Sequence, residues 1–155
     1  MKSVLFICSG NIFRSLSAEH ALRLSLGSSQ SMLVGSAGTI AEPTDVPPLV
    51  RRILAELGAD VGNHVPRRLT AEMLTSASHP VAISIDHQTF VRDQFGVSIP
   101  LLNELAYGQT SSVPDLWEVY PDWRERPAHM IEIYTRSTIN HIFECIPRIL
   151  MKLGH

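Results

Sequence analysis

Short apolar runs alternate along the chain with stretches of helical spacing. Ser3–Ile7 is mostly apolar, which is typical of a buried parallel strand. In Ser15–Leu26 the apolar residues recur on one side of a helix, and Gly27 follows as a stop signal. The same reasoning predicts strands over Met32–Gly35, Val81–Ile85 and Val97–Leu102, helices over Pro48–Leu57, Thr89–Phe95 and Arg124–Lys152, and a loop over Gln109–Trp123. We expect Pro147 to kink or end the last helix.

This alternation predicts the fold class and the edge at which chemistry takes place. Strands separated by helices form a mostly parallel sheet with helices on both faces. We therefore expect one α/β domain over residues 1–155, with three α/β/α layers around a roughly four-stranded parallel sheet. Active sites in such sheets lie beyond the carboxyl ends of the strands. Cys8, Ser36 and Asp86 each follow a predicted strand, so we expect them at that edge, with Asp86 also a plausible helix N-cap.

Composition narrows the function classes without identifying one. The chain has 155 residues, of which 45% are hydrophobic and 18% charged, with a net charge of −2, so neither nucleic acid nor a membrane surface is an expected partner. Its two cysteines, Cys8 and Cys145, make no disulfide framework, and no zinc-type cluster is visible. We expect no metal, no cofactor, no membrane span and a cytoplasmic location, whereas the oligomeric state stays open.

The octapeptide CSGNIFRS carries the strongest chemical signal. A loop between a strand and a helix N-terminus directs several backbone N–H groups to one point, which forms an anion cradle. Gly10 would let the backbone turn tightly, and Arg14 can hold two oxygens of a phosphate. The donors that bind a dianion would also stabilise a thiolate at Cys8. We therefore predict a phosphate-binding loop made of Cys8, Ser9, Gly10, Asn11, Ile12, Phe13, Arg14 and Ser15, with a cysteinyl-phosphate intermediate that water later attacks. The alternative is an inert, buried Cys8 beside an Arg14 that pairs with a surface carboxylate.

The segment VLFICSGNIFRSLSAEHAL resembles the opening of the low-molecular-weight protein tyrosine phosphatases. In that family an apolar strand precedes Cys-x-Gly-Asn-x-Cys-Arg-Ser-Pro-x-Ala-Glu. The resemblance continues at SAGT (36–39), at GADVGNHVPRRL (58–69) and at VPD (113–115). It implies a four-stranded parallel sheet flanked by helices, no metal, and hydrolysis of phosphotyrosine through a phosphocysteine.

The resemblance also implies roles for individual positions. Cys8 matches the nucleophile and Arg14 matches the phosphate clamp. Four further residues match positions that hold the loop open or join its polar network, namely Asn11, Ser15, Ser36 and His64. For Ser36 a turn position, and for His64 a solvated loop position, are the alternatives.

The leaving oxygen of a phosphomonoester needs a proton, and two aspartates could supply it. The family's acid lies on a late loop, and VPDLWEVYPDW contains Asp115 and Asp122. Asp115 follows Val-Pro and has Trp117 two positions on, where the family's pocket-wall aromatic would fall, whereas Asp122 could cap the last helix. We predict Asp115 as the acid and Trp117 as a wall that stacks on the substrate ring, with a packing role as the alternative for Trp117.

Departures from the family pattern keep three functions in view. Phe13 stands where the family usually has a second cysteine, and Leu16 and Leu116 stand where it has prolines. The first function is a phosphatase acting on a phosphotyrosine protein or an aryl phosphate, with phosphoarginine still open. The second, an arsenate reductase, needs further cysteines to relay a disulfide. The third is a phosphate- or phosphopeptide-binding module without turnover, but a binder requires neither the thiol nor the acid.

Overall fold

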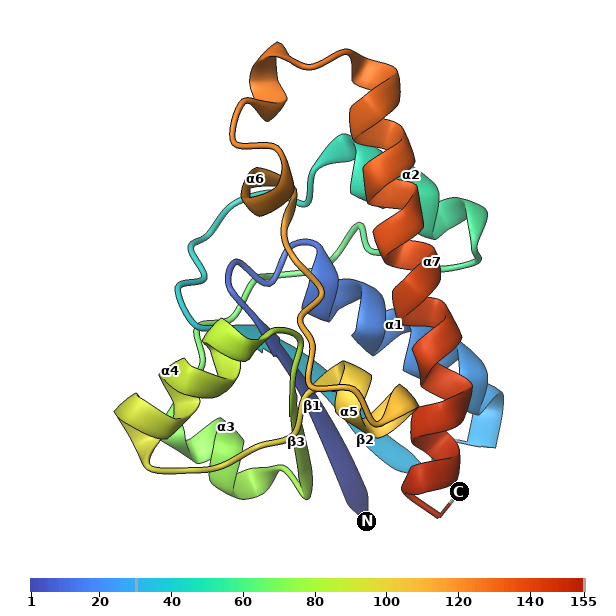
Figure 1. Cartoon of the computed structure of the whole chain (residues 1–155). Coiled ribbons are helices and arrows are strands. Elements are labelled where there is room, and N and C mark those ends of the chain that lie inside the picture. The colour runs from blue at the N-terminus through green and yellow to red at the C-terminus, as the bar shows by residue number, and fades with distance from the viewer. Residues whose placement is uncertain (30, 155) are drawn as a thin grey trace.

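The computed structural model describes residues 1–29 and 31–154 and has a parallel sheet at its centre. The strands are β1 (Lys2–Cys8), β2 (Met32–Gly38) and β3 (His79–Ala82), in the order β2-β1-β3. The central strand β1 is fully buried from Val4 onward. Its last residue, Cys8, lies opposite Gly38 of β2, and Ile7 lies opposite Ala82 of β3. All three carboxyl ends therefore meet at one edge (Figure 1).

Helices cover both faces of this sheet, as predicted. They are α1 (Arg14–Leu26), η1 (Gly27–Ser29), α2 (Pro48–Glu56), α3 (Ala71–Ser76), α4 (Ile85–Phe95), α5 (Leu102–Tyr107), α6 (Leu116–Val119), η2 (Trp123–Glu125) and α7 (Ala128–Lys152). Val4 and Phe6 of β1 pack with residues of α1, α5 and α7, whereas Leu5 and Ile7 pack with residues of α3 and α4. The period-two alternation of a strand thus divides the core into two layers. In Figure 1, α3 and α4 lie on one side of the sheet and α1 and α7 on the other.

The predicted fourth strand, Val97–Leu102, is wrong. Within the described residues, this segment makes one isolated bridge, between Leu101 and Ala82, and α5 begins at Leu102. Pro100 accepts a hydrogen bond from the Ala82 amide at 2.9 Å. Neither Pro100 nor Pro80 of β3 has an N–H to donate, so the ladder does not extend beyond this bridge toward the start of β3.

Other boundaries also differ from the predictions. The third strand ends at Ala82 rather than Ile85, and Ser84 is the N-cap of α4. Asp86 therefore lies in the first turn of α4 and is not the cap. Pro147 does not end α7, which continues to Lys152. No helix in the described residues has the length and apolarity needed to cross a bilayer.

Candidate active site

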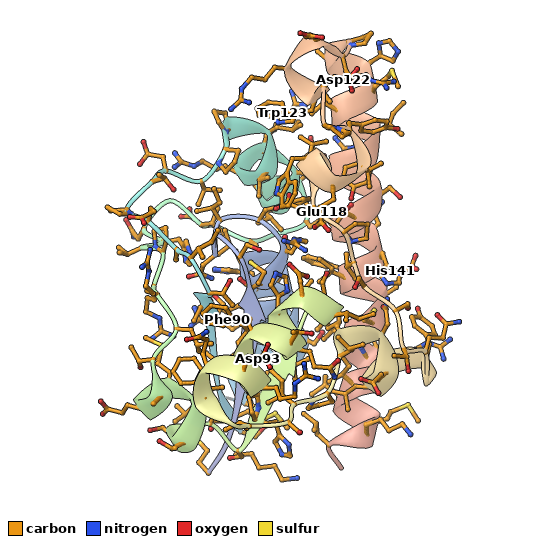
Figure 2. All side chains as sticks on the ribbon, turned by 60° about the vertical axis from the view of Figure 1, so that its left-hand side comes forward. Phe90, Asp93, Glu118, Asp122, Trp123 and His141 are labelled. Carbon is orange, nitrogen blue, oxygen red and sulfur yellow. The ribbon has the colours of Figure 1, made fainter. Side chains whose placement is uncertain are left out.

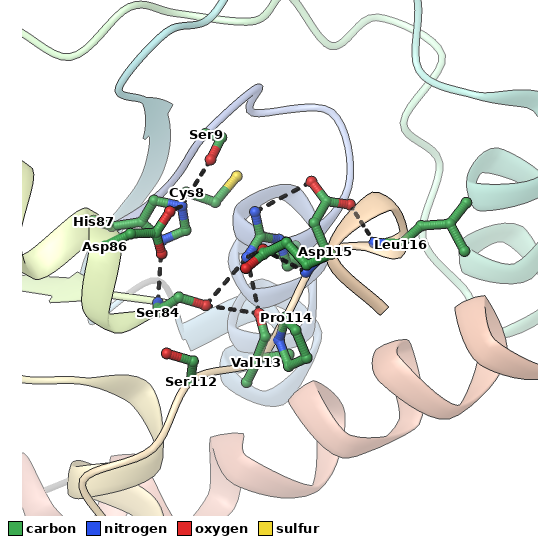
Figure 3. A network of polar contacts seen from close by, with 12 residues as sticks. Cys8, Ser9, Ser84, Asp86, His87, Ser112, Val113, Pro114, Asp115 and Leu116 are labelled. Atoms are coloured by element: carbon green, nitrogen blue, oxygen red, sulfur yellow. Dashed lines mark hydrogen bonds and ion pairs between the residues drawn. The ribbon is translucent and has the colours of Figure 1, made fainter. Parts of the chain in front are cut away.

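The loop of residues 8–15 lies at the carboxyl edge of the sheet, between β1 and α1 (Figure 3). The end of β2 supports it, because the Thr39 amide donates to the Cys8 carbonyl at 2.8 Å and the Ile40 amide to the Ser9 carbonyl at 3.1 Å. A Cβ at Gly38 would lie 2.3 Å from the Ser9 carbonyl oxygen. Only glycine therefore lets β2 approach the loop this closely.

Asn11 organises the loop from within. It is buried, and its φ of 59° lies in the left-handed region, which Asn tolerates better than most residues. We expected Gly10 to supply the tight turn, but among the described residues of this loop the positive φ belongs to Asn11. The side-chain nitrogen of Asn11, Nδ2, donates to Ser15 Oγ at 2.9 Å and to Ser36 Oγ at 2.8 Å. Its side-chain oxygen accepts from the Arg67 amide at 3.0 Å.

The same contacts place the Ser15 hydroxyl where it can stabilise an ionised Cys8. The Cys8 Sγ and Ser15 Oγ atoms are 2.9 Å apart. Asn11 donates to Ser15 Oγ and holds it beside the sulfur, and the hydroxyl proton of Ser15 remains available as a donor. Cys8 is a free cysteine, so this hydroxyl can donate to a thiolate.

Two further predicted residues join the same network. His64 donates from Nε2 to the Asn11 carbonyl at 2.6 Å. Ser36 is buried and donates to Oε1 of Glu19. The other carboxylate oxygen of Glu19, Oε2, pairs with Arg23 at 2.7 Å. Sequence reasoning gave Glu19 no role, although the Ala-Glu pair that ends the family motif falls on Ala18 and Glu19.

Arg14 is the most constrained charge of the site, with a side chain only 1% exposed. Its Nη1 donates to Ser84 Oγ at 3.1 Å and to the Val113 carbonyl at 2.8 Å. Its Nη2 pairs with Asp115 Oδ2 at 3.2 Å, and a Glu118 oxygen lies 3.8 Å from Nη1. Sequence reasoning missed Ser84, which comes from the junction of β3 and α4.

The structure brings Asp115 to the loop and leaves Asp122 outside it. Asp115 is the N-cap of α6, and its Oδ1 accepts from the Leu116 amide at 2.7 Å (Figure 3). Asp122 is exposed and pairs with Arg126 at 3.0 Å. It lies farther from the sheet than Glu118 does (Figure 2). The N-cap of α7 is Pro127, so Asp122 does not cap the last helix.

His87 is a buried group that sequence reasoning also missed. Its Nδ1 accepts from the Ser84 amide at 3.1 Å, and its Nε2 lies 2.9 Å from Ser9 Oγ. Burial, and next the nearby charge of Arg14, lower the pKa of His87 to about 4. No spacing in the sequence links position 87 to the loop.

A cavity of about 440 Å³ opens over the loop. Its walls are mainly apolar and include Ile12, Leu49, Leu116, Trp117 and Trp123. Trp117 is 55% exposed, which argues against the alternative of a core tryptophan.

The second cysteine lies in a different environment. Cys145 is buried on α7, with its Sγ 3.6 Å from His141 Nε2, and that nitrogen is 2.7 Å from Asn103 Oδ1. Burial, and next the charge of Glu144, raise the pKa of the Cys145 thiol to about 11. A thiol of this kind is a poor nucleophile. Within residues 1–29 and 31–154, no group of three or more His, Cys, Asp or Glu side chains is placed to hold a metal ion.

Comparisons with known proteins point to one family. The family model for low molecular weight phosphotyrosine protein phosphatase matches residues 3–115. The low molecular weight protein-tyrosine-phosphatase Ptp of Acinetobacter johnsonii is 23% identical over 141 residues, which cover 91% of this chain and 98% of that protein. Etp of Escherichia coli K12, a low molecular weight protein-tyrosine-phosphatase, is 32% identical over 85 residues, or 55% of this chain and 56% of its own.

Solved structures show the same fold. The low molecular weight protein tyrosine phosphatase of T. tengcongensis has a TM-score of 0.82 and 24% identity, covering 98% of this chain and 99% of its own. The YwlE arginine phosphatase of Geobacillus stearothermophilus also has a TM-score of 0.82, with 22% identity over 99% of this chain and 94% of its own. At these identities the likeness is one of fold.

Proposed function

Because the chain belongs to the low molecular weight phosphotyrosine protein phosphatase family, we propose that it hydrolyses aryl phosphomonoesters, above all phosphotyrosine, through a phosphocysteine at Cys8. One observation carries this proposal: Cys8, Arg14 and Asp115 line the same cavity. They come from β1, α1 and the cap of α6, and a buried network holds the first two in place.

In the first step, the Cys8 thiolate attacks phosphorus, an S–P bond forms and the bond from phosphorus to the phenol oxygen breaks. The loop amides and Arg14 hold the phosphate oxygens. The Asp115 carboxyl group donates its proton to the leaving oxygen, so that a neutral phenol departs. Without substrate, Arg14 pairs with Asp115. A bound dianion would compete for the guanidinium and release the carboxyl group for this task.

In the second step, the Asp115 carboxylate takes a proton from water while the water oxygen attacks phosphorus. The S–P bond breaks, inorganic phosphate leaves and the Cys8 thiolate is restored. The hydrogen bond from Ser15 stabilises the charge that returns to the sulfur. A thiolate that leaves easily shortens the life of the intermediate.

The cavity walls favour an aromatic alcohol over a guanidinium as the leaving group. Ile12, Leu116 and Trp117 offer the apolar contacts that a phenyl ring needs. Phosphoarginine would bring a polar, cationic guanidinium, which needs an acidic partner when it is buried. Of the described residues that line the cavity, Asp115 alone carries a carboxyl group, and as the acid of the first step it is protonated and lacks the negative charge that a guanidinium needs.

The test is hydrolysis of p-nitrophenyl phosphate and of a phosphotyrosine peptide under reductant and with a chelator, beside a phosphoarginine peptide. We expect Cys8→Ser to abolish turnover and Asp115→Asn to lower kcat at least about a hundredfold, the range of general acid catalysis. Asp122→Asn is the matched control and should behave as wild type. Faster hydrolysis of phosphoarginine would refute the substrate preference but not the phosphocysteine route.

The same experiment separates the other two functions. Phosphate or vanadate binding without any turnover would support the binding module. An arsenate reductase of this fold needs a cysteine relay, and the sequence offers only Cys145, whose thiol is buried with a raised pKa. Reduction of arsenate with thiol consumption would nevertheless overturn the assignment.

A further inference from the structure

His87 connects two parts of the phosphate site that are distant in sequence. It lies in the first turn of α4 and its side chain is 1% exposed. On one side it meets the hydroxyl of Ser9 in the loop, and on the other it meets the backbone of Ser84 (Figure 3). A buried imidazole with both nitrogens engaged is held in a single orientation.

The partners of the ring determine its tautomer. The Ser84 amide can only donate, so His87 Nδ1 must accept and carries no proton. The remaining proton therefore lies on Nε2, which is 2.9 Å from Ser9 Oγ and 3.7 Å from Asp86 Oδ2. Ser9 is the nearer acceptor, so Nε2–H donates to its hydroxyl.

Burial, and next the charge of Arg14, keep the ring neutral. Arg14 from α1 disfavours a second cation, and Asp86 from α4 opposes it only weakly because Asp86 is exposed. Protonation would also cost the bond from the Ser84 amide to Nδ1. A neutral ring is the form that fits this site.

Ser84 extends the connection to the phosphate clamp. Its Oγ accepts from Arg14 Nη1 at 3.1 Å and donates to the Val113 carbonyl at 2.7 Å. The path Ser9–His87–Ser84–Arg14 thus links the start of the loop to the guanidinium through the β3–α4 junction.

We propose that His87 is a positioning residue, which fixes Ser9 and hence the loop amides in register with Arg14 so that both bind the same phosphate. It does not donate or accept a proton in the reaction, since both ring nitrogens are occupied within the protein. The proposal rests on the proposed phosphate site but not on turnover.

Three variants test the contacts of the two ring nitrogens separately. In His87→Asn the side-chain oxygen can still accept from the Ser84 amide, but the side chain is too short to reach Ser9. In His87→Gln the amide nitrogen takes the place of Nε2 and can still donate to Ser9. Ser9→Ala removes the acceptor from a half-buried surface position, where folding is at little risk.

The measurement is the Kd of inorganic phosphate by calorimetry, together with kcat and KM on p-nitrophenyl phosphate. We expect His87→Asn and Ser9→Ala each to raise the Kd about fivefold to tenfold, the equivalent of one net hydrogen bond. Their combination should be no worse than either alone, because both remove the same contact. His87→Gln should stay within about twofold of wild type.

His141→Asn is the matched control, since His141 lies on α7 and hydrogen-bonds Asn103 rather than the loop (Figure 2). An unchanged phosphate Kd in Ser9→Ala would overturn the proposal, as would additive effects in the double variant. A large loss of kcat in His87→Asn at an unchanged phosphate Kd would also overturn the proposal, because His87 would then take part in the chemistry. Phosphate binding needs no turnover. An inactive wild type would therefore refute the proposed function, but the phosphate Kd values of the variants would still test the role of His87.

Discussion

At the scale of single residues, the Ser15 hydroxyl is placed to stabilise a thiolate at Cys8. Asn11 holds the Ser15 hydroxyl beside the sulfur, and a thiolate has no proton of its own, so Ser15 is the donor once Cys8 is ionised. A hydrogen bond to a charged group contributes about 1.5–3 kcal/mol. The Ser15 hydroxyl should therefore matter most when the thiolate leaves phosphorus.

Ser15→Ala should accordingly lower kcat on p-nitrophenyl phosphate by about tenfold to a hundredfold, with a smaller change in KM. Ser17→Ala is the control, because Ser17 is buried on the same helix but its hydroxyl donates to the Phe13 carbonyl rather than to Cys8. Steady-state rates and a rapid-mixing burst of p-nitrophenol measure the effect. Because the substitution should slow the second step, the absence of a burst in Ser15→Ala would contradict this role for Ser15.

Gly38 provides a second prediction at this scale. A methyl group at Gly38 would collide with the Ser9 carbonyl, whereas one at Gly35 would meet the movable end of the Arg67 side chain at 2.9 Å. We expect Gly38→Ala to destabilise the fold by about 1–3 kcal/mol and to weaken phosphate binding, and Gly35→Ala to do neither. Urea unfolding and phosphate titration of both variants provide the check. Equal behaviour of the two variants would mean that the loop can move away from β2.

The residues that the sequence could predict are those that lie close together along the chain. Those of the loop, Cys8 to Ser15, are contiguous, and their spacing carries the chemistry. Ser84 and His87 act from the β3–α4 junction, and their contacts depend on the path of the chain rather than on spacing. Asp115 was predicted by its position in a motif, and its pairing with Arg14 emerged only from the fold.

At the scale of elements, the acid is carried by a helix of four residues, α6. Such a helix cannot sustain itself, so its caps must hold it. Glu118 accepts from the Asp115 amide at 2.9 Å, and Asp115 in turn caps the helix. Glu118 also lies 3.8 Å from Arg14, where its charge competes with a bound phosphate.

These two roles of Glu118 predict opposite effects on binding and turnover. Glu118→Ala should lower kcat about fivefold, because losing half of a capping box costs about 1 kcal/mol and the acid then spends less time in place. Phosphate should bind no more weakly than to wild type, since a competing carboxylate is gone. Glu125→Ala, an exposed change in the adjacent η2, is the control. Weaker phosphate binding in Glu118→Ala would contradict this account.

Short elements were also the ones that sequence patterns missed. Helices α3, α5 and α6 span at most six residues, which is too few for a 3.6-residue period to show. The longer elements β1, α1 and α7 were predicted to within a few residues because their apolar positions repeat. The predicted strand Val97–Leu102 failed because an apolar run does not reveal which backbone groups will find a partner.

At the scale of the whole molecule, the buried imidazole links the site to stability. The pKa of His87 falls from an ordinary 6.5 to about 4 on folding, so between these values the unfolded chain binds more protons than the folded one. Stability contributed by the neutral ring is therefore complete above about pH 6.5 and is lost as the pH falls toward 4. His20, whose pKa burial also lowers, acts in the same direction, so the share of His87 must be measured as a difference.

His87→Gln supplies that difference, because glutamine does not titrate and leaves His20 unchanged. Between pH 7 and pH 5 the wild type should lose about 2 kcal/mol of unfolding free energy more than the variant does. Urea titrations at both pH values, with equal slopes required for the comparison, give this number. The carboxylates Glu56 and Glu132, whose pKa values fall through pairing with Arg136, are present in both proteins and cancel. A wild-type-minus-variant difference that stays constant from pH 7 to pH 5 would mean that His87 titrates alike in the folded and unfolded chains. The geometry argues against that outcome, because the Nδ1 atom that would take the proton is the acceptor for the Ser84 amide.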